Sequence, residues 1–172
     1  ISGGVLGEIA EPVQKMIDIA YKNSRRLTHL INDLLDMEKI AAGKVNFDLL
    51  VQPLMPLLEQ AVESTRTYSA ERRVDLTITQ TVEDAEVRID SQRFLQILTN
   101  LLSNAIKFSP DNGVVEIAVT RVSPGIRISV KDHGPGIPAE FRNRIFQKFA
   151  QADSSDTRGQ SGTGLGLAIS LE

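Results

Sequence analysis

The sequence contains no cysteine, which excludes disulfides, cysteine-ligated zinc sites and a thiol nucleophile. Aromatic residues make up only 5% of the 172 residues, too few for a base-stacking surface, and the net charge of −3 gives no general attraction to nucleic acid. No apolar run approaches the roughly 18 residues that a membrane span requires. We therefore expect a soluble protein of a reducing compartment, with no nucleic-acid partner and no direct membrane contact.

Two further absences concern the start of the chain and its phosphate-binding motifs. The first residue is Ile1 rather than methionine and no signal peptide is visible, so we expect that upstream sequence is missing. The sequence contains neither a G-x-x-x-x-G-K-[ST] loop nor a G-x-G-x-x-G fingerprint. A P-loop nucleotidase and a Rossmann dinucleotide site are therefore not expected.

The first quarter of the chain has the apolar spacing of a long helix. Glu11-Pro12 is a typical helix start and Gly43 a typical stop. Between them, steps of four and three residues form a heptad seam of Val13, Ile17, Ala20, Ser24, Leu27, Ile31, Leu34, Glu38 and Ala41. Further apolar residues beside the seam suit a four-helix bundle. Because such a helix is not stable alone, we predict that it dimerises as part of a helical hairpin.

After Gly43 the pattern changes to alternating strands and helices. We predict strands at 45–51, 74–79, 87–90, 114–122 and 126–130, the last two as an antiparallel hairpin. Helices are predicted at 54–69 and after Asp90, which can cap the second one. The fold class is α+β, with a helix layer on a mixed sheet. We expect two domains: a helical one at 1–43 and a second, C-terminally truncated one at 44–172.

Four short motifs occur in a fixed order in the last third of the chain. They are Asn100-Leu-Leu-Ser-Asn104-Ala-Ile-Lys107-Phe108, Asp132-His-Gly134-Pro-Gly136-Ile137, Ile145-Phe146-Gln-Lys-Phe149 and Gly162-Thr163-Gly164-Leu165-Gly166-Leu. Taken singly, they have ordinary explanations as a solvated helix face, an Asp-x-Gly turn and a flexible loop. Taken together, they indicate a site for Mg-ATP.

The chemistry of these motifs supports that interpretation. Asn100, Asn104 and Lys107 fall on one edge of a helix, where an amide oxygen can bind Mg²⁺ and the lysine can meet phosphate. Asp132 ends a strand at a glycine turn, and a carboxylate there can accept a hydrogen bond from the adenine amine. The alternating glycines that open the last helix can wrap phosphates.

The ordered set resembles the N, G1, F and G2 boxes of sensor histidine kinases of two-component systems. Residues 23–40 also resemble the second helix of the dimerisation and histidine-phosphotransfer hairpin of that family. The resemblance covers roughly residues 8–172. It implies a Bergerat-fold α/β sandwich that binds ATP, preceded by a fragment of a helical hairpin.

The resemblance also implies roles for individual residues. Asn104 would hold Mg²⁺, Asn100 and Lys107 would be catalytic, and Phe146 and Phe149 would anchor a mobile lid at 150–161. The residues implied in ATP binding are Asn100, Asn104, Lys107, Phe108, Asp132, Gly134, Gly136, Ile137, Phe149, Gly162, Thr163, Gly164, Leu165 and Gly166. Asn100 replaces the glutamate of the hydrolytic Bergerat enzymes, and an amide cannot serve as a general base. Phosphoryl transfer is therefore favoured over hydrolysis.

The phosphoacceptor box of the family, His-Glu/Asp-x-x-x-x-Pro, does not occur in this sequence. Neither His29 nor His133 is followed by a carboxylate, and we assign a catalytic role to neither. The resemblance implies an ATP-dependent protein-histidine kinase that transfers the γ-phosphate to a histidine of the first hairpin helix. A response-regulator aspartate then receives it. The alternatives are a nucleotide-binding or dimerisation scaffold without catalysis and a serine kinase of the same fold.

The family also implies a cellular setting and an assembly. We expect a homodimer formed through the helical hairpin, and a receiver domain of a response regulator as partner. The domain is expected to be cytoplasmic, in an intact protein that is either soluble or anchored in a membrane and facing the cytoplasm.

Overall fold

A computed structural model describes residues 10–151 and 163–171 of the chain. The chain separates into two compact units, residues 1–45 and residues 46–172, and each is described by itself. No helix among the described residues is long and apolar enough to cross a bilayer.

The described part of the first unit is the single helix α1 (Glu11–Ala41). Pro12 lies in its first turn, where no backbone N–H is needed, and Gly43 follows its end with φ +62°. The predicted start and stop are therefore confirmed. Many apolar side chains of α1 are exposed, among them Leu27 at 58% and Ile31 at 49%. The other exposed members are Val13, Met16, Ile19, Tyr21, Leu34 and Leu35.

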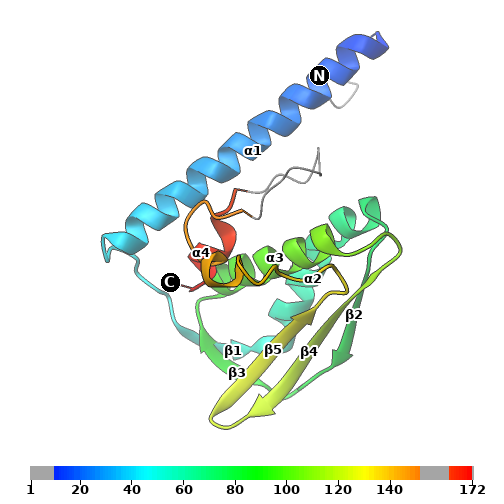
Figure 1. Cartoon of the computed structure of the whole chain (residues 1–172). Coiled ribbons are helices and arrows are strands. Elements are labelled where there is room, and N and C mark those ends of the chain that lie inside the picture. The colour runs from blue at the N-terminus through cyan, green and yellow to red at the C-terminus, as the bar shows by residue number, and fades with distance from the viewer. Residues whose placement is uncertain (1–9, 152–162, 172) are drawn as a thin grey trace. The chain divides into compact units, whose positions relative to one another are not determined.

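The second unit is built from five strands, three α-helices and one short 3-10 helix among the described residues (Figure 1). Their order is β1 (Leu50–Pro53), α2 (Leu54–Glu71), β2 (Asp75–Gln80), β3 (Glu86–Ile89), α3 (Ser91–Phe108), β4 (Val114–Val122), β5 (Gly125–Lys131), η1 (Arg142–Arg144) and α4 (Gly166–Leu171). Apart from β1, the predicted elements agree with these within about two residues.

The strands form a mixed arrangement, as predicted. β4 is central in a three-stranded sheet, parallel to β2 and antiparallel to β5. β1 and β3 form a separate antiparallel pair in which Leu50 lies opposite Ile89. The predicted strand at 45–51 was wrong in its start. Ile89 is the last residue of β3, so residues 45–49 have no strand to pair with.

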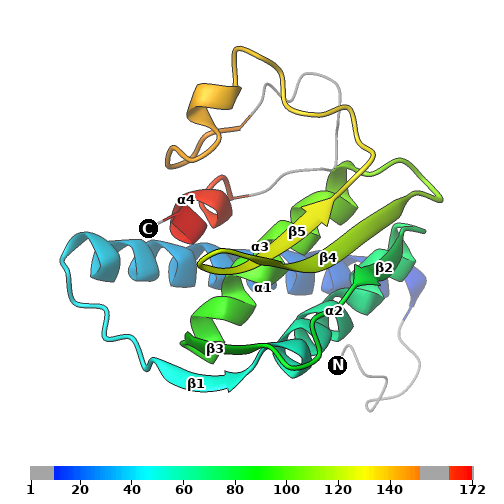
Figure 2. The same ribbon diagram turned by 90° about the horizontal axis from the view of Figure 1, so that it is seen from below.

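The core lies between the sheet and the two helices α2 and α3, which pack against each other on one of its faces (Figure 1, Figure 2). The largest side chains with almost no exposure in this core are Leu54, Leu58, Leu102, Ile106, Val115, Ile117 and Val119. Burying each such side chain contributes about 1.5–3 kcal/mol. Ser69 at the end of α2 donates to the carbonyl of Val74 at 2.6 Å, which fixes the entry into β2. The packing of α3 on this sheet sets the position of its polar edge.

Candidate functional site

The direction of α3 is fixed at its N-terminus by Asp90. Its Oδ1 accepts hydrogen bonds from the backbone N–H groups of Gln92 at 3.0 Å and Arg93 at 3.1 Å, and its Oδ2 accepts one from Asp48 at 3.0 Å. The bonds from Arg93 and Asp48 are the main reasons that the pKa of Asp90 lies below its ordinary value. The predicted cap is confirmed, and it also ties α3 to the segment before β1.

The polar edge of α3 is half-buried, unlike the solvated helix face that was the alternative for this motif. Asn100, Asn104 and Lys107 all have intermediate exposure. The helix α4 packs against α3, and Asn100 Nδ2 donates to the carbonyl oxygen of Gly166 at 3.1 Å (Figure 2). The Nζ of Lys107 lies 4.7 Å from the ring centroid of Phe108, a cation–π distance. The first and fourth motifs are therefore in direct contact.

The glycine turn of the second motif lies against the end of α3. The N–H of Gly134 donates to Asp132 Oδ1 at 2.8 Å. A β-carbon on Gly134 would collide with the carbonyl oxygen of Phe108 and would lie 2.9 Å from Asp132 Oδ1. Gly136 has φ +75°, a conformation that favours glycine, and Ile137 beside it is 45% exposed. The turn thus places the Asp132 carboxylate next to the C-terminal end of the first motif.

An ion pair fixes the strand that leads into this turn. Glu116 of β4 lies opposite Lys131 of β5, and Lys131 Nζ lies 2.9 Å from Glu116 Oε2. The hydrogen bond from Lys131 lowers the pKa of Glu116. His133 Nε2 lies 4.0 Å from Glu116 Oε1 on the surface. His133 therefore lies beside the Glu116–Lys131 ion pair on the surface.

The third motif contacts the fourth through backbone atoms. Phe149 has φ +60° and a side chain that is 62% exposed. Gly164 has φ +71°, and a β-carbon there would lie 2.9 Å from the Cα and carbonyl carbon of Phe149. Leu165 is buried, and its N–H donates to Thr163 Oγ1 at 3.2 Å. Gly162 and residues 152–161 of the lid predicted at 150–161 lie outside the described residues.

The donor set fits a magnesium ion that relies on few protein ligands. Within residues 10–151 and 163–171, no three acidic or histidine side chains gather into a metal-binding group. An amide oxygen such as that of Asn104 is the hard neutral ligand that Mg²⁺ accepts when phosphate supplies further oxygens. The second and fourth motifs contact α3, and the third motif contacts the fourth.

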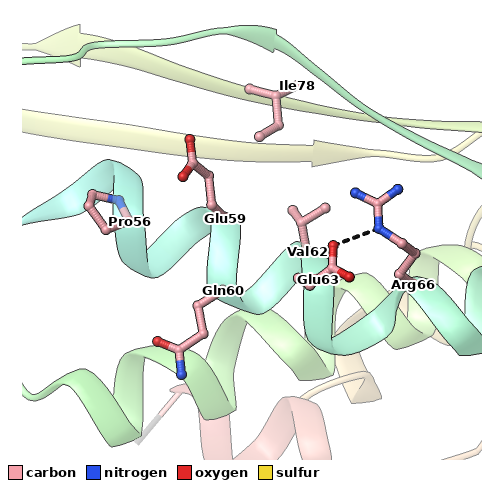
Figure 3. A pocket seen from close by; sticks show the side chains of 7 residues that line it. All are labelled: Pro56, Glu59, Gln60, Val62, Glu63, Arg66 and Ile78. Carbon is pink, nitrogen blue, oxygen red and sulfur yellow. Dashed lines mark hydrogen bonds and ion pairs between the residues drawn. The ribbon is translucent and has the colours of Figure 1, made fainter.

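A hollow of about 440 Å³ elsewhere on the second unit contains no residue of the four motifs (Figure 3). It lies between α2 and β2 and is lined by Pro56, Glu59, Gln60, Val62, Glu63, Arg66 and Ile78. Arg66 Nε is bound to Glu63 Oε2 at 2.6 Å, so its charge is already paired. The hollow therefore adds nothing to the candidate site.

Sequence reasoning missed one polar residue of the site. Ser170 of α4 lies one helical turn after Gly166, and its Oγ lies 3.5 Å from Asn100 Nδ2. The signal in the sequence was its four-residue spacing from the last motif glycine, which places both on one face of a helix.

Comparison with known proteins identifies the second unit. Residues 89–172 match the family described as histidine kinase-, DNA gyrase B-, and HSP90-like ATPase. The hybrid signal transduction histidine kinase D of Dictyostelium discoideum is 35% identical over 165 residues, which cover 93% of this chain and 11% of that protein. The chain spans 11–22% of the length of the first three curated relatives it matches.

Solved structures show the same fold. The catalytic domain of histidine kinase ThkA is 30% identical with a TM-score of 0.61, covering 73% of this chain and 77% of that one. Full-length ShkA, solved in complex with AMPPNP, is 28% identical with a TM-score of 0.73, covering 95% of this chain and 34% of that one. The predicted α+β Bergerat-type sandwich is confirmed. This chain therefore belongs to the sensor histidine kinase family and carries its catalytic ATP-binding domain.

Proposed function

We propose that this chain binds Mg-ATP at the edge of α3 and acts as the catalytic part of a protein-histidine kinase. The observation that carries the proposal is the contact of α3 with both glycine segments. Asn100 donates to Gly166 at 3.1 Å, and Gly134 lies directly against Phe108. Two contacts between residues 26 and 66 positions apart in the sequence thereby bring both glycine segments onto one helix.

Adenine recognition is assigned to Asp132. Its Oδ1 is occupied by the N–H of Gly134, and among the described residues no donor contacts its Oδ2. A carboxylate oxygen can only accept hydrogen bonds, so it selects the exocyclic amine of adenine over the carbonyl of guanine. Ile137 is 45% exposed and Phe108 is 48% exposed beside this turn, which makes both available to cover the base.

Phosphate and metal binding are assigned to the rest of the edge. Asn104 would hold Mg²⁺ through its amide oxygen, and Lys107 and the backbone of Gly162, Gly164 and Gly166 would contact the phosphates. When bound, the metal neutralises phosphate charge and orients the γ-phosphoryl group. Phe149 and Thr163 flank the glycine segment and complete the set of proposed binding residues.

The reaction follows from which groups are present on α3. Asn100 and Lys107 can position and stabilise charge, but an amide and an ammonium cannot accept a proton from water. We therefore propose transfer of the γ-phosphoryl group to a histidine side chain, which is a nucleophile when neutral. The phosphate would pass on to an aspartate of a response-regulator receiver domain. The names of the similar proteins, which are signal transduction histidine kinases, support this assignment.

Titration calorimetry with ATP and GTP tests the adenine assignment. Wild-type protein should bind ATP and discriminate against GTP, and Asp132→Asn should weaken ATP binding by about 1.5–3 kcal/mol, the contribution of a charge-assisted hydrogen bond. Asp84→Asn is the matched control. It removes one negative charge, as Asp132→Asn does, but at an exposed position in the turn between β2 and β3. Equal affinity for ATP and GTP, unchanged in Asp132→Asn, would remove the basis for this site.

A further inference from the structure

A small hydrogen-bonded cluster fastens the start of α4 to α3. The carbonyl oxygen of Gly166 accepts two hydrogen bonds, from Asn100 Nδ2 at 3.1 Å and from Ser170 Oγ at 2.8 Å. Asn100 Nδ2 also lies 3.5 Å from Ser170 Oγ. The three groups therefore form a closed triangle at the point where the glycine segment becomes a helix.

The chemistry of Gly166 dictates what can stand at position 100. A carbonyl oxygen has no proton to donate, so the side chain that faces it must be a donor. Asn100 meets this requirement with its NH₂ group, whereas a carboxylate of the same shape would set two acceptors against each other. The side chain of Asn100 is half-buried, so solvent cannot freely replace a lost bond.

Gly166 and the side chain of Asn100 are also in close steric contact. A β-carbon on Gly166 would lie 3.2 Å from both Cγ and Oδ1 of Asn100, closer than side chains normally approach. Leu165, just before α4, and Ala168 and Ile169 of α4 are buried, at 1%, 4% and 7% exposure. The first turn of α4 is thus held by packing on its apolar side and by the Asn100–Ser170 cluster on its polar side.

We propose that Asn100 and Ser170 are positioning residues that hold the segment Gly164–Gly166 in the form that receives the nucleotide phosphates. Asn100 acts through the carbonyl of Gly166 and not as a ligand of the metal. The proposal rests on the proposed function, because it assumes that this segment contacts phosphate. It assigns a role to Ser170, which the four motifs do not include.

Affinities for ADP without magnesium, ADP with magnesium and ATP with magnesium test the proposal in the full chain. Ser170→Ala removes both hydrogen bonds of the Ser170 hydroxyl, to Gly166 and from Asn100, and should weaken all three affinities by about two- to tenfold. Asn100→Asp should weaken all three by more than tenfold, because it places an acceptor against the Gly166 carbonyl. Ser170→Thr keeps the hydroxyl and should restore wild-type affinity.

Ser103→Ala is the matched control. Ser103 lies on α3, the helix of Asn100, and its exposure is intermediate like that of Ser170. Its hydroxyl donates to the Asn100 carbonyl of its own helix. The backbone amides of residues 165–169 should exchange hydrogen faster in Ser170→Ala and Asn100→Asp than in Ser103→Ala. A change in overall stability alone would not produce this local difference or the rescue by threonine.

Each outcome distinguishes the proposal from its alternatives. If Asn100→Asp keeps or gains affinity when magnesium is present and loses it only without the metal, its carboxylate is serving as a metal ligand, so Asn100 is a metal ligand and the proposal is overturned. If Ser170→Ala behaves like Ser103→Ala in both affinity and exchange, the cluster does not position the segment. Absence of nucleotide binding by the wild type would contradict the proposed function itself, and the exchange data would still show whether the cluster holds α4.

Discussion

At the scale of single residues, two glycines of the site are required by close packing. Gly134 leaves room for the carbonyl oxygen of Phe108, and Gly166 leaves room for the side chain of Asn100. Neither has the positive φ that often explains a glycine. Both contacts join segments that are distant in the sequence. At each position, glycine is needed because α3 and the glycine segment approach each other too closely for a β-carbon.

Alanine at position 134 should therefore destabilise the protein and weaken nucleotide binding. The new β-carbon would collide with the backbone carbonyl of Phe108, and the clash can be relieved only if the turn moves away from α3. Overpacking of this kind lowers the free energy of unfolding by about 1–3 kcal/mol. Gly125→Ala is the control, since nothing lies within 4 Å of a β-carbon there. Urea unfolding and ADP titration provide the measurements. Equal behaviour of the two variants would show that the contact with Phe108 is unimportant.

Asn104→Ala tests the metal assignment at the same scale. Loss of the amide oxygen should reduce the magnesium dependence of ATP binding more than it reduces binding of ADP without metal. Gln92→Ala, on the exposed face of the first turn of α3, controls for replacement of an amide by alanine. Titrations with and without Mg²⁺ that respond alike in wild type and Asn104→Ala would exclude Asn104 as the ligand.

The sequence predicted the residues of this site better than their contacts. The spacing of Asn100, Asn104 and Lys107 along a helix is local and could be inferred from periodicity. The bond from Asn100 to Gly166 spans 66 positions, and no local pattern encodes it. The four-residue spacing of Ser170 from Gly166 could be read from the sequence, but its contact with Asn100 could not be predicted, because that contact depends on the way α4 packs against α3.

At the scale of elements, the helices and the β4–β5 hairpin followed from the sequence, but the start of β1 did not. The apolar residues of 45–51, which alternate with polar ones in its first half, predicted a strand there, whereas only residues 50–53 pair with β3. The bounds of a strand depend on the length of its partner strand, and the paired residues of β1 and β3 are 33 to 39 positions apart in the sequence. Phe47 and Leu49, which precede β1, are exposed at 54% and 46%.

The cap of α3 gives a prediction with a defined dependence on pH. Ionised Asp90 is stabilised in the folded protein, so its pKa is lowered from the model-compound value of 3.8. The contribution of ionised Asp90 to the free energy of unfolding is complete above pH 3.8 and is lost as the pH falls through the lower pKa of the folded state. The melting temperature of Asp90→Asn should be below that of wild type at neutral pH, and the difference should shrink at acidic pH.

Thermal unfolding followed between neutral pH and about pH 3 makes this measurement. Asp111→Asn, at an exposed position of the turn before β4, controls for the removal of a carboxylate. A difference between wild type and Asp90→Asn that stays constant or grows in acid would contradict the assigned role of the carboxylate charge.

At the scale of the whole molecule, α1 exposes many large apolar side chains to solvent. Leu27 and Ile31 belong to the predicted seam, and both are about half exposed or more. A helix of 31 residues with such a face is stabilised in water by packing against other helices. We propose that α1 belongs to a helical dimerisation domain and pairs with a second copy of the chain.

Light scattering of the intact protein tests this proposal. Leu27→Asp and Ile31→Asp should dissociate the dimer, because each would bury an unpaired charge in the seam. Asn32→Asp, on the same helix but outside the seam, should leave the dimer intact. A monomeric wild-type protein, or a dimer that tolerates both seam variants, would count against a helical bundle.

Transfer of labelled phosphate shows whether this chain supplies the catalytic half of a histidine kinase. The chain is incubated with γ-labelled ATP, Mg²⁺ and a separate polypeptide that carries a His-Glu phosphoacceptor helix. We predict acid-labile label on that helix, none on His29 or His133 of this chain, and loss of transfer in Asn104→Ala. Label on this chain that disappears in His29→Gln, or hydrolysis of ATP without any transfer, would contradict the account.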